Sequence, residues 1–314
     1  MANVIRGLQS CPAELRGGFV SIGNFDGVHR GHAGILARLR ELAGRDRAAA
    51  VVFTFDPPPV RLLRPDRAPP VLTWLERKIE LIGAFGIDTI VIYPTNRELL
   101  GMRPEQFFQT IVVEGLGARG LVEGPTFAFG RDRAGNVETL RALCSKFGLT
   151  LEVAEPYSYG SEVVSSTRIR QTLDSGKVET AAEMLGRPHR IRGRVIRGQR
   201  RGHALGVPTA NLDGVDTALP ADGVYAVRVW LAGAEDRRSW GGAMNLGPNP
   251  TFGEFARKVE VHLIGFSGEL YGDTLEVDFL ARLRDTRNFA SADELVAQLR
   301  SDVRRATEVA SHDP

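Results

Sequence analysis

Cysteine is scarce in this sequence, which has only Cys11 and Cys144 among its 314 residues. Two isolated thiols cannot form a disulfide framework, so a reducing compartment is expected. The first residues mix charged side chains with short apolar steps and lack the continuous apolar segment of a secretory signal. No apolar run approaches the length of a transmembrane helix. We therefore expect a cytoplasmic protein with no membrane partner.

Net charge is also low, at +2 from 40 Lys and Arg residues and 38 Asp and Glu residues. This balance gives no general attraction to nucleic acid or to a membrane surface. The sequence has no Gly-x4-Gly-Lys-Ser/Thr loop, because the near match Gly176-Lys177 is followed by Val178. A phosphate site in the second half is therefore not of the P-loop type. The length allows one large core or two moderate ones.

Strands and helices alternate through the first half of the chain. Apolar runs predict buried strands at residues 18–22, 48–55, 88–93, 119–124 and 150–153. Amphipathic spacing predicts helices at residues 33–42, 74–85, 105–113 and 140–147, the second of them capped by Thr73. A long loop follows Asp56, and long loops in compact domains are often functional. The alternation predicts an α/β fold, a doubly wound, Rossmann-like parallel sheet with its ligand crevice at the carboxyl ends of the strands.

Residues 23–32 form the predicted turn between the first of these strands and the first helix. Gly23 and Gly27 allow the backbone to come close to a ligand. His29 and His32 stand three residues apart at the helix start, so they share a face, and the free N–H groups of that helix end favour an anion. The combination indicates a phosphate site. Two surface histidines, or two metal ligands, are the alternatives, but no cysteine stands at ligand spacing.

The pattern Gly23-x-Phe25-Asp26-x-x-His29-x-Gly31-His32 resembles the signature of the nucleotidyltransferase superfamily. That superfamily transfers a nucleotidyl group from a nucleoside triphosphate to a phosphate acceptor. The signature does not select the acceptor, and it leaves open the related site of class I aminoacyl-tRNA synthetases.

A second segment, residues 163–170, matches the other signature of that superfamily. It places three hydroxyls before a helix and two arginines in the first turn of that helix: Ser165, Ser166, Thr167, Arg168 and Arg170. Capping together with a solvated surface is one interpretation. Arginine at a helix start opposes the helix dipole, however, and this suggests an anionic partner. The resemblance implies that the segment closes over a triphosphate opposite the two histidines.

The pattern changes near Gly186, where we predict a boundary between domains 1–186 and 187–314. Strands are predicted at residues 191–197, 223–231, 241–246, 259–264 and 275–283, with a final helix from about residue 292 to 306. Turns rich in Gly, Pro and Asp separate the strands, which is typical of a small antiparallel β-barrel. Seven arginines lie between Arg187 and His203, and RNA binding is an alternative for this stretch. The spaced glycines that follow suit a nucleotide and its metal better.

Residues 193–212, 220–225, 245–252 and 259–263 resemble the riboflavin kinase module. With the first half, the whole chain resembles the bacterial bifunctional riboflavin kinase/FAD synthetases, and the motifs occur in that family's order. The resemblance implies that the C-terminal domain phosphorylates riboflavin to FMN with ATP. The N-terminal domain then adenylylates FMN to FAD and releases pyrophosphate. It implies Mg²⁺ as cofactor, flavins and ATP as partners, no nucleic acid, and at most transient self-association.

The kinase residues follow from the same resemblance. Thr209 and Asn211 are implied to hold Mg²⁺ with ATP, and Glu260 to accept the ribityl 5′-hydroxyl proton during attack on the γ-phosphate. On sequence pattern alone, Glu260 would be an outward residue of an alternating strand. Further residues implied to line this site are Gly198, Gly202, Gly206, Pro208, Asn245, Arg284 and Arg287.

In the adenylyltransferase, the attacking FMN phosphate is already anionic and needs no general base. His29, His32 and Arg170 are therefore implied to stabilise developing charge and the leaving group. Asp26 is expected either to orient the turn or to help hold Mg²⁺. Residues implied to line the nucleotide are Gly23, Phe25, Asp26, Gly31, Ser165, Ser166, Thr167 and Arg168.

One loop departs from the family pattern, which usually has an acidic or amide residue followed by Phe-Arg-Phe-Gly. This chain has Thr126-Phe127-Ala128-Phe129-Gly130, where FMN is expected to bind. Either adenylylation is weaker, or Phe127 and Phe129 hold the flavin by stacking, or both rings are ordinary core.

Two other functions compete with the two-step enzyme. The first keeps a nucleotidyltransferase with another phosphorylated acceptor, but the intact kinase motifs argue against it. The second is a non-enzymatic regulator that binds flavin or RNA, in which the phosphate-handling residues would be dispensable. RNA binding would show a steep salt dependence, and flavin binding would not.

Overall fold

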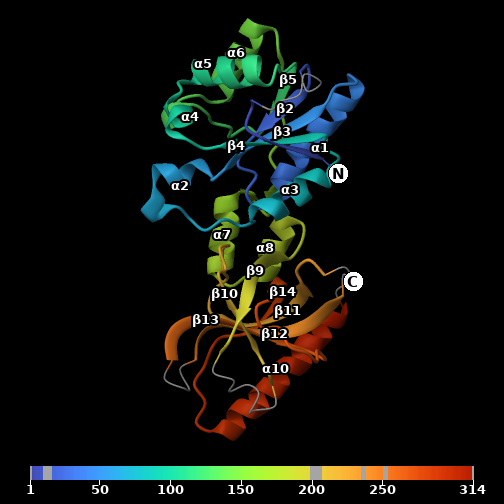
Figure 1. Ribbon diagram of the computed structural model, residues 1–314, viewed down its shortest axis with the longest axis vertical. Coiled ribbons are helices and arrows are strands. Elements are labelled where there is room, and N and C mark those ends of the chain that lie inside the picture. The colour runs from blue at the N-terminus through green and yellow to red at the C-terminus, as the bar shows by residue number, and fades with distance from the viewer. Residues whose placement is uncertain (1, 10–15, 199–206, 235–237, 250–253, 313–314) are drawn as a thin grey trace. The chain divides into compact units, whose positions relative to one another are not determined.

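A computed structural model describes residues 2–9, 16–198, 207–234, 238–249 and 254–312. The chain divides into two compact units. The N-terminal unit comprises Met1–Pro69 and Trp74–Ser165, and the C-terminal unit comprises Pro70–Thr73 and Ser166–Pro314. Figure 1 colours the chain from blue at the N-terminus to red at the C-terminus.

A six-stranded sheet forms the centre of the N-terminal unit, and all of its neighbouring strands are parallel. In spatial order its strands are β1 (Asn3–Arg6), β4 (Thr89–Pro94), β3 (Ala50–Asp56), β2 (Phe19–Ile22), β5 (Gly120–Glu123) and β6 (Thr150–Val153). The predicted doubly wound parallel sheet is confirmed. The sequence interpretation missed β1, because only Ile5 of its four residues is buried and no apolar run marks it.

Helices cover both faces of this sheet. The bounds are α1 (Arg30–Arg45), α2 (Pro59–Leu63), α3 (Leu75–Gly83), α4 (Arg97–Gly101), α5 (Pro104–Phe107) and α6 (Val137–Phe147), with shorter or wider turns at η2 (Pro65–Arg67), η3 (Phe108–Gly115) and η4 (Arg131–Arg133). The strand pair β7 (Ser158–Tyr159) and β8 (Glu162–Val163) completes the unit. Two predictions were wrong in detail. The long loop contains α2 and η2, and α3 has Trp74, not Thr73, as its cap.

Two hydrophobic clusters occupy the two faces of the sheet. One joins α1 and α3 to the sheet through Leu36, Leu39 and Ile82. The other joins η3 and α6 to the opposite face through Ile111 and Leu140. Because β2, β3 and β4 contribute alternate residues to each cluster, their sequences are mostly apolar, as strands buried on both sides require.

The order of the strands creates a switch point beside β2. The chain passes from β2 to β3 and β4 on one side, and then returns to place β5 and β6 on the other side. In open α/β sheets, ligands bind where the order reverses, beyond the carboxyl ends of the strands. Residues 23–32 follow β2 and residues 124–135 follow β5, so both predicted loops belong to this switch point.

A closed barrel of six antiparallel strands forms the core of the C-terminal unit (Figure 1). Around the barrel the order is β10 (Ala210–Asp213), β13 (Glu254–Leu263), β12 (Ser239–Asn249), β11 (Gly223–Leu231), β14 (Thr274–Arg284) and β9 (His189–Ile196). The predicted barrel is confirmed, with β10 added to the five expected strands. Its interior is filled by residues such as Tyr225, Val261 and Phe279, which are fully buried.

Three helices accompany the barrel in this unit: α7 (Ser166–Asp174), α8 (Val178–Leu185) and α10 (Ala292–His312). The C-terminal helix packs on β11, and Ala306 is buried there against Val224 and Ala226. The helices α7 and α8 thus group with the barrel, whereas the functional boundary near Gly186 stays a prediction. Within the described residues, no helix has both the length and the apolar character needed to span a membrane.

Candidate active sites

The turn after β2 ends in two stacked histidine rings. His29 is the N-cap residue of α1, and its Nδ1 accepts a hydrogen bond from the backbone N–H of His32 at 3.3 Å. That bond leaves Nε2 of a neutral His29 to carry the proton. The two rings stack with centroids 3.7 Å apart, and the Phe25 ring lies 5.2 Å from the His32 ring. The sequence prediction that both imidazoles share one face of the helix start is confirmed.

The backbone of this turn is held in an unusual conformation. Phe25, Gly27 and Val28 have φ angles of +47°, +84° and +38°. Positive φ is costly for a bulky or β-branched side chain, and such strain gathers at functional sites. At Gly31 a Cβ atom would lie 3.1 Å from the His29 ring, so a larger residue there would displace that ring slightly.

A buried lysine, which the sequence interpretation missed, supports the same turn. Lys78 of α3 is only 5% exposed, and its Nζ lies 3.3 Å from the Asn24 carbonyl oxygen and 3.2 Å from the Thr54 hydroxyl. Burial lowers the pKa of Lys78, while the nearby carboxylates of Asp26 and Asp56 act in the opposite direction. Asp26 is itself buried.

A buried carboxyl group lies on the other side of the switch point and was also missed. Glu123, the last residue of β5, is 2% exposed and accepts a hydrogen bond from the Ile22 backbone N–H at 2.7 Å. Burial raises the pKa of Glu123 well above its usual value, and the bond from Ile22 offsets only part of this rise. The pairing of β2 with β5 covers Phe19 and Val20, so the Glu123 side chain takes the N–H beyond the paired region.

The aromatic loop after β5 belongs largely to the core. Phe129 is 6% exposed, and Phe127 stacks on it with centroids 5.4 Å apart. Both rings pack in the cluster that covers this face of the sheet. Thr126 is exposed. Of the alternatives for this loop, the core position holds for Phe129, and a contact of Phe127 with flavin stays a prediction.

The second predicted phosphate segment lies at the start of α7. The helix begins at Ser166, directly after Ser165, and Arg170 donates from Nε to the Pro70 carbonyl oxygen at 2.8 Å. Arg168 and Thr167 occupy its first turn. The predicted position of this segment opposite the two histidines stays a prediction, because α7 and the histidines belong to different units.

In the barrel, three predicted kinase residues line up across neighbouring strands. Glu260 of β13 pairs with Asn211 of β10 on one side and with Asn245 of β12 on the other. Residues paired in register project from the same face of a sheet. The neighbouring Val259 and Val261 are buried in the interior, so Glu260 and the two amides lie on the outer face.

The segment before β10 borders this row. A Cβ atom on Gly198 would lie 2.3 Å from Nδ2 of Asn211, so the absence of a side chain at Gly198 leaves room for the Asn211 amide in its present position. Pro208 and Thr209 are exposed, and the Pro208 carbonyl accepts a hydrogen bond from Nδ1 of His262 at 2.7 Å. The predicted Gly202 and Gly206 lie outside the described residues.

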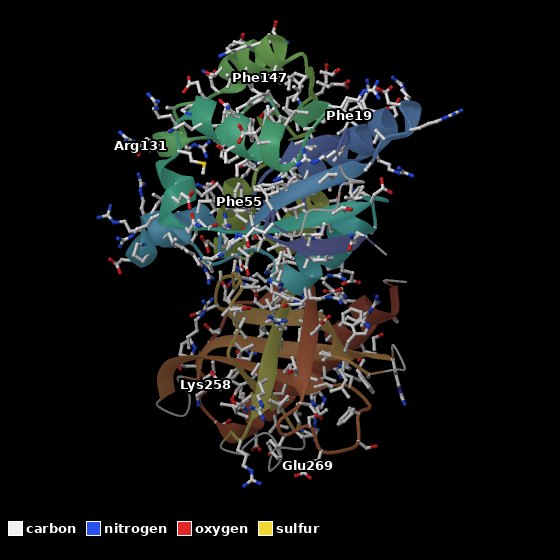
Figure 2. The ribbon with its side chains drawn as sticks, turned by 45° about the horizontal axis from the view of Figure 1, so that its top comes forward. Phe19, Phe55, Arg131, Phe147, Lys258 and Glu269 are labelled. Carbon is white, nitrogen blue, oxygen red and sulfur yellow. The ribbon has the colours of Figure 1, made fainter. Side chains whose placement is uncertain are left out.

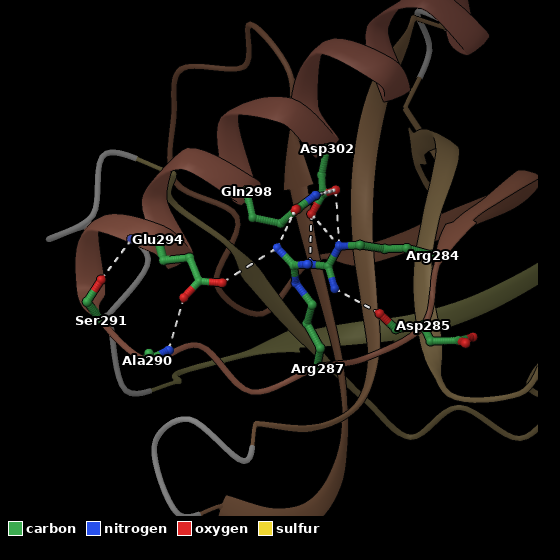
Figure 3. Close-up of polar contacts among 8 residues, drawn as sticks. All are labelled: Arg284, Asp285, Arg287, Ala290, Ser291, Glu294, Gln298 and Asp302. Atoms are coloured by element: carbon green, nitrogen blue, oxygen red, sulfur yellow. Dashed lines mark hydrogen bonds and ion pairs between the residues drawn. The ribbon is translucent and has the colours of Figure 1, made fainter.

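The two arginines expected near the flavin make ion pairs with the last helix (Figure 3). The Arg284 guanidinium is 2.8 Å from a carboxylate oxygen of Asp302, whose side chain is 2% exposed. Arg287 donates to the Gln298 side chain at 2.8 Å and lies 3.9 Å from Glu294. These bonds fix the β14–α10 connection, and contact of either arginine with flavin stays a prediction.

Comparison with known proteins gives a class to each half of the chain. The family model for FAD synthetase matches residues 11–168, and the model for riboflavin kinase matches residues 185–310. The fold and these matches define a class of protein in which a nucleotidyltransferase sheet is joined to a flavokinase barrel.

Individual relatives match over almost their full length. The bifunctional riboflavin kinase/FMN adenylyltransferase of Pseudomonas fluorescens is 38% identical over 309 residues, which cover 98% of both chains. The protein of that name from Escherichia coli strain K12 is 33% identical and covers 97% of both chains. The chain therefore belongs to the family of bifunctional riboflavin kinase/FMN adenylyltransferases, as the sequence motifs predicted.

A solved structure shares the fold. The crystal structure described as a macrolide-efflux protein from Streptococcus pneumoniae has a TM-score of 0.85 and 28% sequence identity, with 97% of this chain and 98% of that chain covered. That description names another activity, so the family models and the curated relatives carry the functional assignment.

Proposed function

We propose that this chain makes FAD in two steps, with ATP as the second substrate of each. The C-terminal unit phosphorylates riboflavin to FMN, and the N-terminal unit transfers an adenylyl group to FMN and releases pyrophosphate. The observation that carries the proposal is the pairing of two different phosphate-handling arrangements in one chain. One is the stacked His29 and His32 at the switch point, and the other is the row of Asn211, Glu260 and Asn245 on the barrel.

In the kinase step, Glu260 accepts the proton of the ribityl 5′-hydroxyl while that oxygen attacks the γ-phosphorus. ADP leaves with the bridging oxygen. A carboxylate on the open face of β13 suits this role, because it is half-exposed and flanked by two neutral amides. Asn245 and the Gly198 segment border the same face and would position the nucleotide.

Magnesium is the cofactor that this proposal requires. The proposed ligands are the Thr209 hydroxyl and the Asn211 amide oxygen. Hard oxygen ligands of this kind fit Mg²⁺, which would take its remaining ligands from phosphates and water. The ion would neutralise phosphate charge during transfer.

In the adenylylation step, an FMN phosphate oxygen attacks the α-phosphorus of ATP and pyrophosphate leaves. The strained turn and the N-terminus of α1 offer backbone N–H groups, and His29 and His32 offer imidazole donors. These groups stabilise the charge that develops on the phosphates. Arg170, with Arg168 in second place, is proposed to serve the leaving group. A cytoplasmic location and the absence of nucleic-acid partners complete the proposal.

The test is incubation of the purified protein with riboflavin, ATP and Mg²⁺, with the flavins separated by chromatography over time. FMN followed by FAD is the expected result. FMN without FAD would mean that the N-terminal unit uses another phosphorylated acceptor, and the absence of FMN would overturn the proposal.

Point variants separate the two steps within one chain. Glu260→Gln should lower the rate of FMN formation by about 100-fold or more, the usual contribution of a general base, and leave FMN adenylylation intact. His29→Asn should do the reverse, with a loss of about 100-fold in FAD formation from added FMN. Glu269→Gln, at an exposed carboxylate of the barrel labelled in Figure 2, is the matched control.

A further inference from the structure

Lys78 is the only buried lysine among the residues that the structure describes. Its ammonium group meets three oxygen acceptors at the carboxyl ends of β2 and β3. Its Nζ lies 3.2 Å from the Thr54 hydroxyl, 3.3 Å from the Asn24 carbonyl oxygen and 3.4 Å from the Phe55 carbonyl oxygen. An ammonium group has three N–H donors, so these three oxygens match its full capacity. With 5% exposure, it has almost no access to water.

The three acceptors belong to two different segments. Asn24 is in the turn that follows β2, whereas Thr54 and Phe55 are near the end of β3. The Thr54 hydroxyl also donates to the Asn24 carbonyl at 3.3 Å, so Lys78 and Thr54 both donate to the same backbone oxygen. This small network fixes the beginning of the turn that contains the residues with positive φ.

Burial of an ammonium group costs free energy of desolvation, and a methionine would fill the same space without that cost. Burial lowers the pKa of Lys78, whereas the carboxylates of Asp26 and Asp56 raise it and so favour the charged form. A buried charge is costly, and this one bonds to the turn that we propose to bind phosphate, which points to a role in the reaction.

We propose that Lys78 is a positioning residue of the adenylyltransferase: by holding the Asn24 carbonyl against the end of β3, it keeps the strained turn in the shape that directs His29 and His32 at the phosphates. This inference rests on the proposed function of the N-terminal unit. Lys78 touches no substrate. It acts through the backbone at Asn24 and through its charge beside Asp26.

The main test is Lys78→Met, which keeps most of the stem and removes the charge and the three donors. A displacement of about 1 Å in a catalytic group costs on the order of 100-fold in rate. We therefore expect the kcat of FAD formation from FMN to fall by about 10- to 100-fold, with the KM for FMN changed by less than about threefold. Riboflavin phosphorylation by the same preparation should stay within about twofold of the wild type, since its residues lie in the other unit.

Lys146→Met is the matched control. Lys146 is an exposed lysine of α6 in the same unit, with its ammonium over the Phe147 ring. It should leave both activities within about twofold of the wild type. An equal loss of FAD formation in both variants would overturn the inference.

A double-mutant cycle distinguishes positioning from general loss of stability. Thr54→Val removes the hydroxyl that joins Lys78 to Asn24 and keeps the lysine. If both side chains act through Asn24, the double variant should lose less than the product of the two single losses in kcat. Multiplied losses, or a lower melting temperature with an unchanged kcat, would overturn the inference. Thr54→Val also provides the kinetic test should Lys78→Met fail to fold.

The wild-type arm of the same experiment tests the proposed function separately. Wild-type protein that makes FAD while Lys78→Met keeps its full kcat refutes only the role of Lys78. Wild-type protein that makes no FAD refutes the proposed function, and the role of Lys78 falls with it.

Discussion

His189 should make the barrel sensitive to acid. It is the first residue of β9, is 1% exposed, and its Nε2 donates to the Ala218 carbonyl oxygen at 2.7 Å. Burial, aided by the charge of Arg187, lowers the pKa of His189 from the ordinary 6.5 to about 4, although the hydrogen bond to the Ala218 carbonyl acts in the opposite direction. The folded barrel therefore holds the neutral imidazole, and the unfolded chain binds the proton more readily.

The sign and the size of the effect follow from linkage. Because the folded pKa is depressed for a base, stability is full above pH 6.5 and falls as the pH drops toward 4. Between pH 8 and pH 5 this one group should reduce the free energy of unfolding by about 2 kcal/mol. The titration of the carboxylates lies mainly below this range.

Urea unfolding of the full chain, followed by tryptophan fluorescence between pH 8 and pH 5, measures this loss. A Trp74→Phe background leaves Trp230 and Trp240, which both belong to the barrel. His189→Gln should lower stability at pH 8 through the altered hydrogen bond and should flatten the pH dependence. If wild type and variant lose the same stability between pH 8 and pH 5, or if NMR gives His189 a pKa near 6.5, the reasoning is refuted.

Three further substitutions test other contacts. Arg284→Met leaves the buried Asp302 carboxylate without its ion-pair partner, so the unfolding free energy of the barrel should fall by about 3–5 kcal/mol in urea titrations. Arg45→Met, at an exposed pair, should cost less than about 1 kcal/mol. Gly176→Ala places a Cβ atom 1.8 Å from Nη1 of Arg282, at a residue whose φ is +72°. The free energy of unfolding should therefore fall by about 1 kcal/mol or more, and hydrogen exchange in α7 should become faster. Glu123→Gln should raise the melting temperature at pH 7 and change nothing below pH 4.5. The raised pKa of Glu123 means that its contribution is present at low pH and is lost as the pH rises, and amide Oε1 can still accept from Ile22.

The sequence predicted those parts of the fold in which local pattern and tertiary environment agree. The strands β2 to β5 are mostly apolar because both of their faces are buried, and the two histidines at the helix start are three residues apart, so they lie on one face. β1 and β10 were missed because each has only four residues and few of them are buried: one in β1 and two in β10. Pairing with distant strands, rather than any local signal, makes them strands.

The missed site residues share a different cause. Lys78 lies at a helix position where a lysine usually reaches solvent, and Glu123 ends an apolar strand where a carboxylate usually projects outward. Only the packing of α3 over the β2 turn, and the end of β2–β5 pairing, show that both are buried. The pattern of hydrophobic and polar residues along the chain does not predict such contacts, because they join residues far apart in the sequence.

The four residues Pro70–Thr73 bear on how the chain is assembled during synthesis. Val71 bridges to Thr217 and accepts a hydrogen bond from the Ala218 N–H at 2.8 Å, so this piece of the first half is completed by the second. A ribosome delivers Val71 long before Ala218, and domains generally fold in the order in which they emerge. The parallel sheet must therefore form before Thr217 and Ala218, which pair with Val71, have been synthesised. Residues 70–73 are thus expected to reach their final position last, only after Thr217 and Ala218 have left the ribosome.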